Sequence, residues 1–507
     1  MMMKAFNNTY FHKKSIVKRI IRNYKTLKQL LSKFLDNSTQ KLTKIEWGII
    51  LYSTQEKYII TAGSLATVIV AFLLNAAPVA LPSIAKAFAM NNVLQNWVDT
   101  IYLLSIAVFS IPCGKLCQKY GLKNVLKIGI IIFFIGTLGT GLSLDATTLL
   151  LFRVVLGIGS AILNVASIAL IVEGMPDDKK GPALGIAVAA VYIGIALAPI
   201  LGGSLIFNFG WQSLFYATLP VILLNYYLTY KIKDEWKHQD KYKFDITGTT
   251  LYSIGIILFI YGFTRILELT GQLITITGII LLVGFAIWEL KNKNPIFEMR
   301  LFKNVRFAAA NIACLFSYFA TFMITYVYNY HLQYIMGMNS QTAGMFLIIT
   351  PAIMVVMSIV SGWLIKRFEG EYLTGFGLCI LAVAFILLCT LNNSTPLWLI
   401  LVAMTLHGIG YGLFSSPNTV LITTTVPEDE ASKASASLSA MRLIGQTVSL
   451  GIFTTVFAII MGNVAITPEY YNLLLQSSHI ITIIAVIFVV VGAIISFIGL
   501  KGNNILQ

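Results

Sequence analysis

The chain is dominated by apolar stretches of about twenty residues or more, and these stretches restrict the folds open to it. A helix that crosses the hydrocarbon core of a bilayer needs about 20 such residues. Only 11% of the residues are charged, compared with about 25% in a typical soluble domain. Membrane barrels would instead show short segments of alternating polarity. The sequence therefore predicts an all-α integral membrane protein.

Fourteen such segments can be counted, and the positive charges test the count. Their centres lie near residues 70, 106, 135, 160, 196, 221, 257, 281, 318, 354, 382, 408, 449 and 489. With the N-terminus inside the cell, all but four of the 36 Lys and Arg residues fall on the inner side; the four are Lys86, Arg153, Arg265 and Arg442. This distribution follows the positive-inside rule. We therefore expect a multi-pass protein of the cell membrane with both termini in the cytoplasm, and we attribute its net charge of +15 to topology, not to a nucleic-acid partner.

Composition divides the chain into four parts. Residues 1–57 are basic, and the apolar spacing in 12–35 predicts an amphipathic helix on the inner leaflet, with a solubilising tail as the alternative. Residues 58–232 and 304–507 each hold six predicted helices, and residues 233–303 hold a charged linker and two inserted helices. A weak repeat links RVVLGIGSA in helix four to MTLHGIGYG in helix twelve. Repeated halves are typical of transporters, with the substrate between them near the bilayer midplane.

Predicted helix five lacks side-chain bulk on one face. Its small residues and proline are Gly185, Gly194, Ala198, Pro199, Gly202 and Gly203. Three of them, at 194, 198 and 202, are four residues apart, and small residues at this spacing let helices approach closely. Pro199 removes a backbone hydrogen bond, which predicts a kink. We expect this helix to pack tightly while the two halves rock; ordinary packing is the alternative, since Gly and Pro are common in membrane helices.

This spacing resembles the antiporter motif of the major facilitator superfamily, found in the fifth helix of its exporters, although the family has Gly at the position of Ala198. The loop after helix two resembles another motif of the superfamily through Gly114, Lys119, Gly121 and Lys123. Helix four resembles a third through Arg153 and Gly157, and the resemblance implies that this arginine takes part in proton coupling. Snorkelling of Arg153 toward the outer surface is the alternative.

The stretch HLQYIMGMNSQTAG at 331–344, which includes Gln333, resembles helices nine and ten of the fourteen-helix drug:proton antiporter branch. The resemblance covers roughly residues 58–500. It implies the major facilitator fold, with two six-helix halves and two inserted helices. The resemblance of helix five to the antiporter motif favours export over import.

Two departures from the family pattern bear on coupling. The branch commonly carries an Asp in the first helix before Ala-Leu-Pro, whereas FLLNAAP at 72–78 has only Asn75 as a strongly polar residue. The loop after helix two has Gln118 where the family usually has Asp. Asp99 is the candidate replacement, because coupling needs a carboxyl group that exchanges its proton against a neighbouring charge, here Arg153. The alternative is that Asp99 stabilises the first turn of helix two and faces water.

The remaining candidates for the substrate or proton pathway are Tyr102, Tyr326, Gln333, His407, Arg442 and Gln446. Aromatic walls suit bulky, planar or cationic ligands, although an interfacial belt also explains Tyr328 and Tyr330. His407 titrates in a useful range, but a packed neutral histidine is the commoner case. An anchor at the inner surface is the alternative for Arg442.

These observations lead us to expect a secondary transporter that exports hydrophobic or cationic small molecules in exchange for protons. No phosphate loop of the G-x-x-x-x-G-K-[ST] type is present, which argues against coupling to ATP. We expect a monomer in the bilayer that is not an enzyme and needs no cofactor, metal or nucleic acid. Two alternatives stay open: an uncoupled or differently coupled exporter of an anionic metabolite, and a non-transporting membrane sensor or scaffold.

Overall fold

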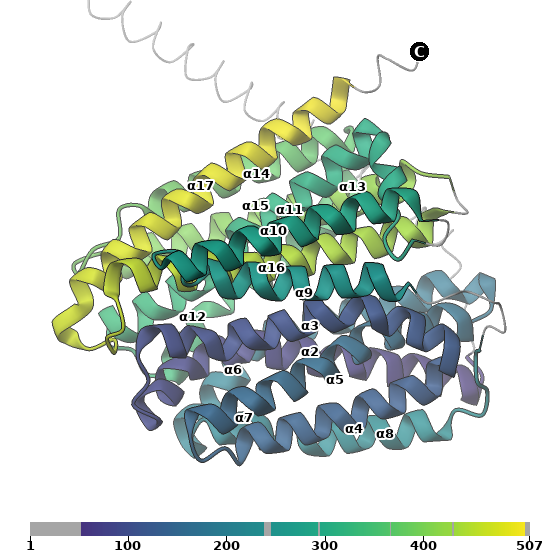
Figure 1. Ribbon diagram of the computed structural model, residues 1–507, viewed down its shortest axis with the longest axis horizontal. Coiled ribbons are helices and arrows are strands. Elements are labelled where there is room, and N and C mark those ends of the chain that lie inside the picture. The colour runs from purple at the N-terminus through teal and green to yellow at the C-terminus, as the bar shows by residue number, and fades with distance from the viewer. Residues whose placement is uncertain (1–51, 238–244, 293–294, 366, 428–429, 502–507) are drawn as a thin grey trace, which may run out of the picture. The chain divides into compact units, whose positions relative to one another are not determined.

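Every regular element in the described residues is a helix (Figure 1). The computed structural model describes residues 52–237, 245–292, 295–365, 367–427 and 430–501. The described residues from Thr54 onward form one compact unit. The amphipathic helix predicted over 12–35 lies outside the described residues.

Thirteen helices in the described residues are long and apolar enough to cross a membrane, which confirms the predicted all-α membrane fold. The long helices and their short partners are α2 (Thr54–Ala87), α3 (Asn92–Tyr120), α4 (Leu122–Gly141), α5 (Ala146–Gly174), α6 (Asp177–Phe209), α7 (Gln212–Tyr216), α8 (Leu219–Lys231), α9 (Ile246–Phe263), α10 (Leu269–Lys291), η1 (Met299–Lys303), α11 (Val305–Tyr330), η2 (His331–Ile335), α12 (Ser340–Leu347), α13 (Ile349–Leu364), α14 (Gly370–Leu388), α15 (Leu397–Thr424), α16 (Ala431–Met461), η4 (Pro468–Tyr470) and α17 (Tyr471–Lys501).

The sixth predicted segment, centred near residue 221, is not one helix but the pair α7 and α8. The break has a local cause in Pro220, which lies in the first turn of α8. Proline has no N–H to donate to the carbonyl group four residues earlier, so the helix cannot continue smoothly through it. Alone, α8 has 13 residues and falls short of a full membrane span.

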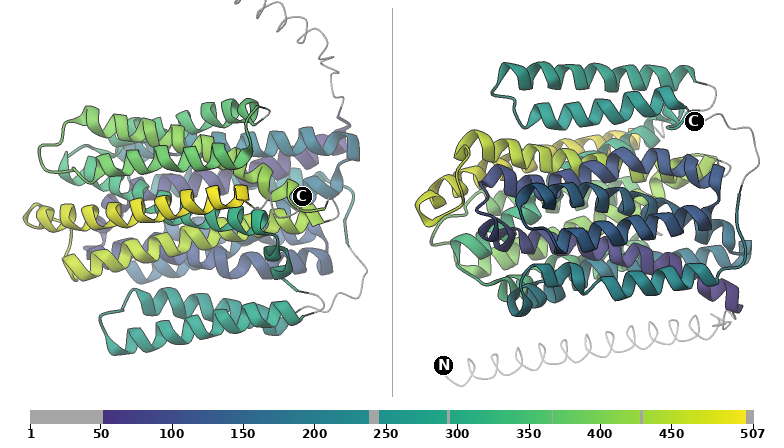
Figure 2. Two further views of the ribbon diagram at one scale, coloured as in Figure 1. Left: turned by 90° about the horizontal axis from the view of Figure 1, so that it is seen from above. Right: turned by 60° about the horizontal axis from the view of Figure 1, so that its bottom comes forward.

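Two groups of helices pack mainly within themselves. We call α2–α8 the N-terminal group and α11–α17 the C-terminal group; α6 meets α12, and α3 meets α16, where the groups touch. The inserted helices α9 and α10 form an antiparallel pair along one side of the bundle, against α3 and α16 (Figure 2). We call the end that carries the connections 88–91, 264–268 and 462–467 the outer end, after the predicted topology, and the opposite end the inner end.

The starts of α3 and α5 are fixed by capping side chains. Asn91 accepts a hydrogen bond from the Leu94 N–H at 2.8 Å and caps α3. Asp145 and Thr148 form a capping box at the start of α5. Because α3 begins at Asn92, Asp99 lies two turns inside the helix and not in its first turn. The alternative of a first-turn Asp facing water is therefore wrong.

Candidate functional site

An ion pair is buried inside the N-terminal group. The Arg153 Nη2 atom of α5 lies 2.9 Å from the Asp99 Oδ1 atom of α3. Arg153 has no exposed surface and Asp99 is 2% exposed. Arg153 therefore does not snorkel to the outer surface. A buried charge pair of this kind is tolerated only when its geometry is good, and removal of one partner leaves an uncompensated charge.

The glycine motif of α5, the fourth predicted helix, brings Arg153 and Asp99 together. A Cβ atom placed on Gly157 would lie 2.5 Å from the Ser105 Cβ atom and 2.7 Å from the Tyr102 carbonyl oxygen of α3. Only a glycine allows the two helices to approach this closely. As a result, Arg153, one turn earlier on α5, reaches across to Asp99.

Two aromatic rings hold the guanidinium group of Arg153. Its central carbon lies 5.4 Å from the ring centroids of both Tyr102 and Phe215. The Tyr102 hydroxyl is fixed in turn by the Ser160 hydroxyl at 2.8 Å. Among the described residues, the Arg153 Nε and Nη1 atoms have no hydrogen-bond partner. The ion pair with Asp99 is therefore the main polar anchor of this arginine.

The Asp99 carboxylate also contacts the C-terminal group. The Tyr326 hydroxyl of α11 donates a hydrogen bond to the Asp99 Oδ2 atom at 3.0 Å. Tyr326 itself is 1% exposed, and its ring packs against Phe453 of α16 with centroids 5.4 Å apart. One carboxylate therefore joins an arginine of one helix group to a tyrosine of the other.

A belt of polar contacts closes the outer end above this carboxylate. Tyr330 donates to the Asn96 Oδ1 atom at 2.6 Å and accepts from the Gln95 amide at 2.9 Å. Asn329 and Gln333 donate to the carbonyl oxygens of Pro78 and Val79, at 2.7 and 3.1 Å. Tyr328 and Tyr330 are 2% and 0% exposed, so the interfacial belt suggested for them is wrong.

Sequence reasoning missed several members of this belt, namely Gln95, Asn96 and Asn329. A signal was present, because uncharged polar residues inside apolar helices tend to find partners across helix interfaces. Gln95 and Asn96 pair with Tyr330, and Asn329 pairs with Pro78, in each case across more than 200 positions, which no local pattern indicates.

At the inner end, a cavity of about 540 Å³ lies between parts of α6 and α13. Gly185, Tyr192 and Ile193 of α6 form one wall, and Ala352 and Val355 of α13 belong to the opposite wall. The two helices belong to different groups. The described residues therefore have their groups in contact at the outer end, with a cavity between them on this side of the inner end.

The small residues of α6 divide between these two ends. A Cβ atom on Gly194 would lie 2.8 Å from the Val68 carbonyl oxygen, and one on Gly202 would lie 2.9 Å from the Ala76 Cβ atom, both on α2. Gly203 approaches the Ser340 carbonyl group, and Gly344 approaches the carbonyl group of Pro199. The expected close packing is thus present in the outer half of α6. Gly185 has open space around it.

The motif at the junction of α3 and α4, which contains Gly121 and Lys123, contacts the segment after α8. Gly121 has a φ of +96°, and the Glu235 carboxylate lies where its side chain would be. Glu235 accepts the Lys123 backbone N–H at 2.9 Å, and the Lys123 ammonium donates to the Ile232 carbonyl oxygen at 3.0 Å. Lys119 is exposed, with its ammonium 5.1 Å from the ring of the adjacent Tyr120. Gly114 has one neighbour near its missing side chain, a Val165 methyl group at 3.9 Å.

The other predicted residues lie apart from the Asp99 carboxylate. Asn75 donates to the Ala71 carbonyl oxygen of its own helix at 2.8 Å. His407 is packed between the rings of Tyr328 and Phe385. Arg442 donates to the Thr419 hydroxyl at 2.9 Å and lies 6.0 Å from the Tyr318 ring centroid. Gln446 follows one turn later on α16.

Comparisons with known proteins agree with this architecture. A sequence model of the Major Facilitator Superfamily matches residues 63–450. The chain is 27% identical over 382 residues to the riboflavin transporter RibZ of Clostridioides difficile (strain 630). The alignment covers 75% of this chain and 83% of RibZ. It is 29% identical over 389 residues to the multidrug resistance protein Stp of Mycobacterium tuberculosis (strain CDC 1551 / Oshkosh), with 75% and 72% covered.

A solved structure shares the fold. It is a bacterial homologue of the human lysosomal transporter Spinster in an inward-facing, occupied conformation. The TM-score is 0.61 at 17% sequence identity, and the match covers 89% of this chain and 98% of that one.

Proposed function

The chain belongs to the major facilitator superfamily of membrane transporters, and from this premise we propose that it exports hydrophobic or cationic small molecules in exchange for protons. The observation that carries the proposal is the Asp99 carboxylate, which is buried between Arg153 of one helix group and Tyr326 of the other. The similarity to Stp supports drug efflux as the physiological role.

The contacts of Asp99 suggest how a proton and the transport cycle are linked. With the outer end closed, the charged carboxylate is held by Arg153 and by the Tyr326 hydroxyl. When α11 moves away from α3, Tyr326 leaves and water from the outer side reaches the carboxylate. A proton that binds there removes the charge that Arg153 attracts. Closure of the outer end restores the ion pair and requires the proton to leave toward the inner side, which moves one proton inward in each cycle.

The inner cavity between α6 and α13 is the proposed entry for the transported molecule. Its walls are mostly apolar, with Tyr192 as an aromatic member. Such walls suit hydrophobic and planar molecules. Because the walls belong to different helix groups, closure of this cavity accompanies opening of the outer end.

The test uses purified protein in liposomes with an imposed inward proton gradient and a fluorescent lipophilic cation. We expect Asp99→Asn to lose gradient-driven transport, at least tenfold, while downhill equilibration continues. Asp99→Glu, which keeps the carboxyl group, should retain part of the driven transport. Asp234→Asn is the matched control, because Asp234 is exposed and distant in the chain. Driven transport by Asp99→Asn at the normal rate would place coupling elsewhere.

One observation favours a second function, export of an anionic metabolite. Within the described residues Arg442 forms no ion pair, and its polar neighbours, Thr419 and Tyr318, are neutral. A cation without a carboxylate partner is suited to an anionic group of a ligand. If anionic solutes compete with transport and Arg442→Gln abolishes that competition, this second function is preferred.

A further inference from the structure

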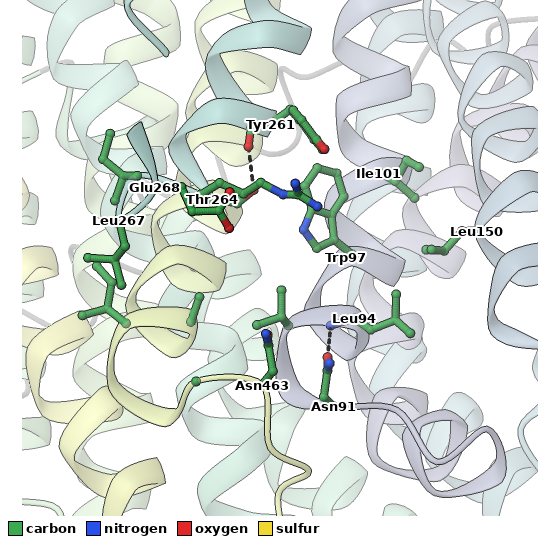
Figure 3. Close-up of a pocket in the computed structure, with 16 residues that line it drawn as sticks. Asn91, Leu94, Trp97, Ile101, Leu150, Tyr261, Thr264, Leu267, Glu268 and Asn463 are labelled. Atoms are coloured by element: carbon green, nitrogen blue, oxygen red, sulfur yellow. Dashed lines mark hydrogen bonds between the residues drawn. The ribbon is translucent and has the colours of Figure 1, made fainter. Parts of the chain in front are cut away.

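A crevice of about 700 Å³ lies at the outer end, where α3, α16 and the connection between α9 and α10 meet (Figure 3). Leu94, Trp97 and Ile101 form the wall on α3. Asp99 points from the opposite face of α3, because two residues along a helix are about 200° apart. The crevice is therefore separate from the proposed coupling site. It is large enough to hold a small molecule or a lipid headgroup.

The crevice lies at the level of the membrane interface. Helix α9 has 18 residues, or about 27 Å of length, which nearly matches the ~30 Å hydrocarbon core. The connection that follows α9 is then at the edge of that core. Trp97 and Tyr261 meet there edge to face, with ring centroids 6.2 Å apart. Trp and Tyr are enriched at this depth in membrane proteins.

Two opposite charges line the crevice without pairing with each other. The Arg265 guanidinium lies 5.0 Å from the Tyr261 ring centroid, and in the described part of the chain no carboxylate lies within ion-pair distance of it. Glu268, three residues later, accepts a hydrogen bond from the Thr270 hydroxyl at 3.2 Å. Both residues are exposed and both line the crevice. A ligand with a negative and a positive group would satisfy them together.

The surface beside the crevice is apolar and exposed. On α10, Leu269 is 70% exposed, and Leu273, one turn further along, is 57% exposed. Large exposed apolar side chains on a membrane helix are contact sites for acyl chains. The charged groups that line the crevice thus lie beside an exposed apolar surface. A phospholipid has the same arrangement, with a charged headgroup next to apolar acyl chains.

We propose that this crevice binds the headgroup of a phospholipid that carries a primary ammonium group. Arg265 holds the phosphate, and Glu268 accepts hydrogen bonds from the ammonium. The amides of Asn91 and Asn463, which line the same crevice, add further polar contacts. A choline headgroup has no N–H to donate to Glu268, and a glycerol headgroup has no cation to offer it.

A bound headgroup would also connect the two helix groups. Trp97 belongs to α3 of the N-terminal group, whereas Ile459 belongs to α16 of the C-terminal group, and both line the crevice. Opening of the outer end separates these walls. The lipid therefore stabilises the outer-closed arrangement, whatever the transported molecule is.

Native mass spectrometry of delipidated protein, titrated with phosphatidylethanolamine or phosphatidylcholine of the same chains, tests the site. We expect at least tenfold tighter binding of the ethanolamine lipid. Arg265→Gln should weaken binding of both lipids about tenfold or more. Glu268→Gln should abolish the preference and leave phosphatidylcholine binding unchanged.

Lys86→Gln is the matched control, since Lys86 is an exposed cation at the outer end that does not line the crevice. Equal binding by wild type and Arg265→Gln would overturn the proposal, as would an equal loss in Lys86→Gln. Tighter binding of phosphatidylglycerol than of phosphatidylethanolamine would overturn the assigned headgroup. None of these readouts uses transport, so they are independent of the proposed function.

Discussion

At the scale of single residues, we expect the fold to be most sensitive to loss of one partner of the Asp99–Arg153 pair. Both charges are buried, and their direct contact is 2.9 Å long. We expect Arg153→Gln to lower the free energy of unfolding by about 3–5 kcal/mol, because it leaves Asp99 as an unpaired buried charge. The double variant with Asp99→Asn should recover most of this loss. Equilibrium unfolding of the four proteins gives the coupling energy, and independent effects of the two substitutions would contradict a direct pair.

The sequence was sufficient to name Asp99, Arg153 and Tyr326, but not to connect them. Asp99 and Tyr326 are separated by 227 positions, and their contact depends on how α11 packs against α3. The depth of Asp99 depended on the N-cap at Asn91, which sequence reasoning did not identify. A capping residue shifts every later side chain relative to the membrane surface, so without it a position in the first turn stayed open as the alternative for Asp99.

At the scale of the helices, α6 shows where missing side chains matter. We expect Gly194→Leu and Gly202→Leu to destabilise the protein by about 1–3 kcal/mol, since each adds bulk where α6 touches α2. Both should slow transport at least fivefold without blocking membrane insertion. Gly181→Leu is the matched control, because Gly181 lies on the same helix, its Cβ atom would meet open space, and it does not line the inner cavity. Thermal unfolding and liposome transport measure the two effects, and normal transport by Gly202→Leu would refute the role given to close packing.

Helix boundaries were harder to predict than helix existence. Hydropathy predicts a span near residue 221 because α7 and α8 are both apolar, and it does not detect the break at Pro220. By contrast, the inserted pair was located despite Arg265 and Glu268, which lie in or next to the short connection between its helices. Charged residues indicate a connection between two membrane helices. A proline does not by itself indicate a break, because proline is common within membrane helices.

At the scale of the whole bundle, the two ends differ in how the helix groups meet. The distribution of positive charges predicts on which side of the membrane each connection lies, but it contains no information on which faces of the two helix groups touch. The outer contacts pair α6 with α12, as in the hydrogen bond from Gln341 to the Ser204 hydroxyl at 3.2 Å. At the inner end, a cavity lies between parts of α6 and α13. Alternating access then requires the first contact to break whenever the second gap closes.

A cross-link at the outer end tests this reciprocal movement. Ser204→Cys and Gln341→Cys, in a background with Cys379 and Cys389 replaced by Ser, place two thiols across the contact between α6 and α12. A short bifunctional thiol reagent should lower liposome transport at least tenfold in the double variant, because the groups can no longer separate there. In the same background, the variants with only Ser204→Cys or only Gln341→Cys, treated identically, should keep their transport, since the remaining Cys113, Cys117 and Cys314 are buried. If the cross-linked protein transports at the rate of the untreated one, the outer contact does not open during the cycle, and Asp99 must reach its proton by another route.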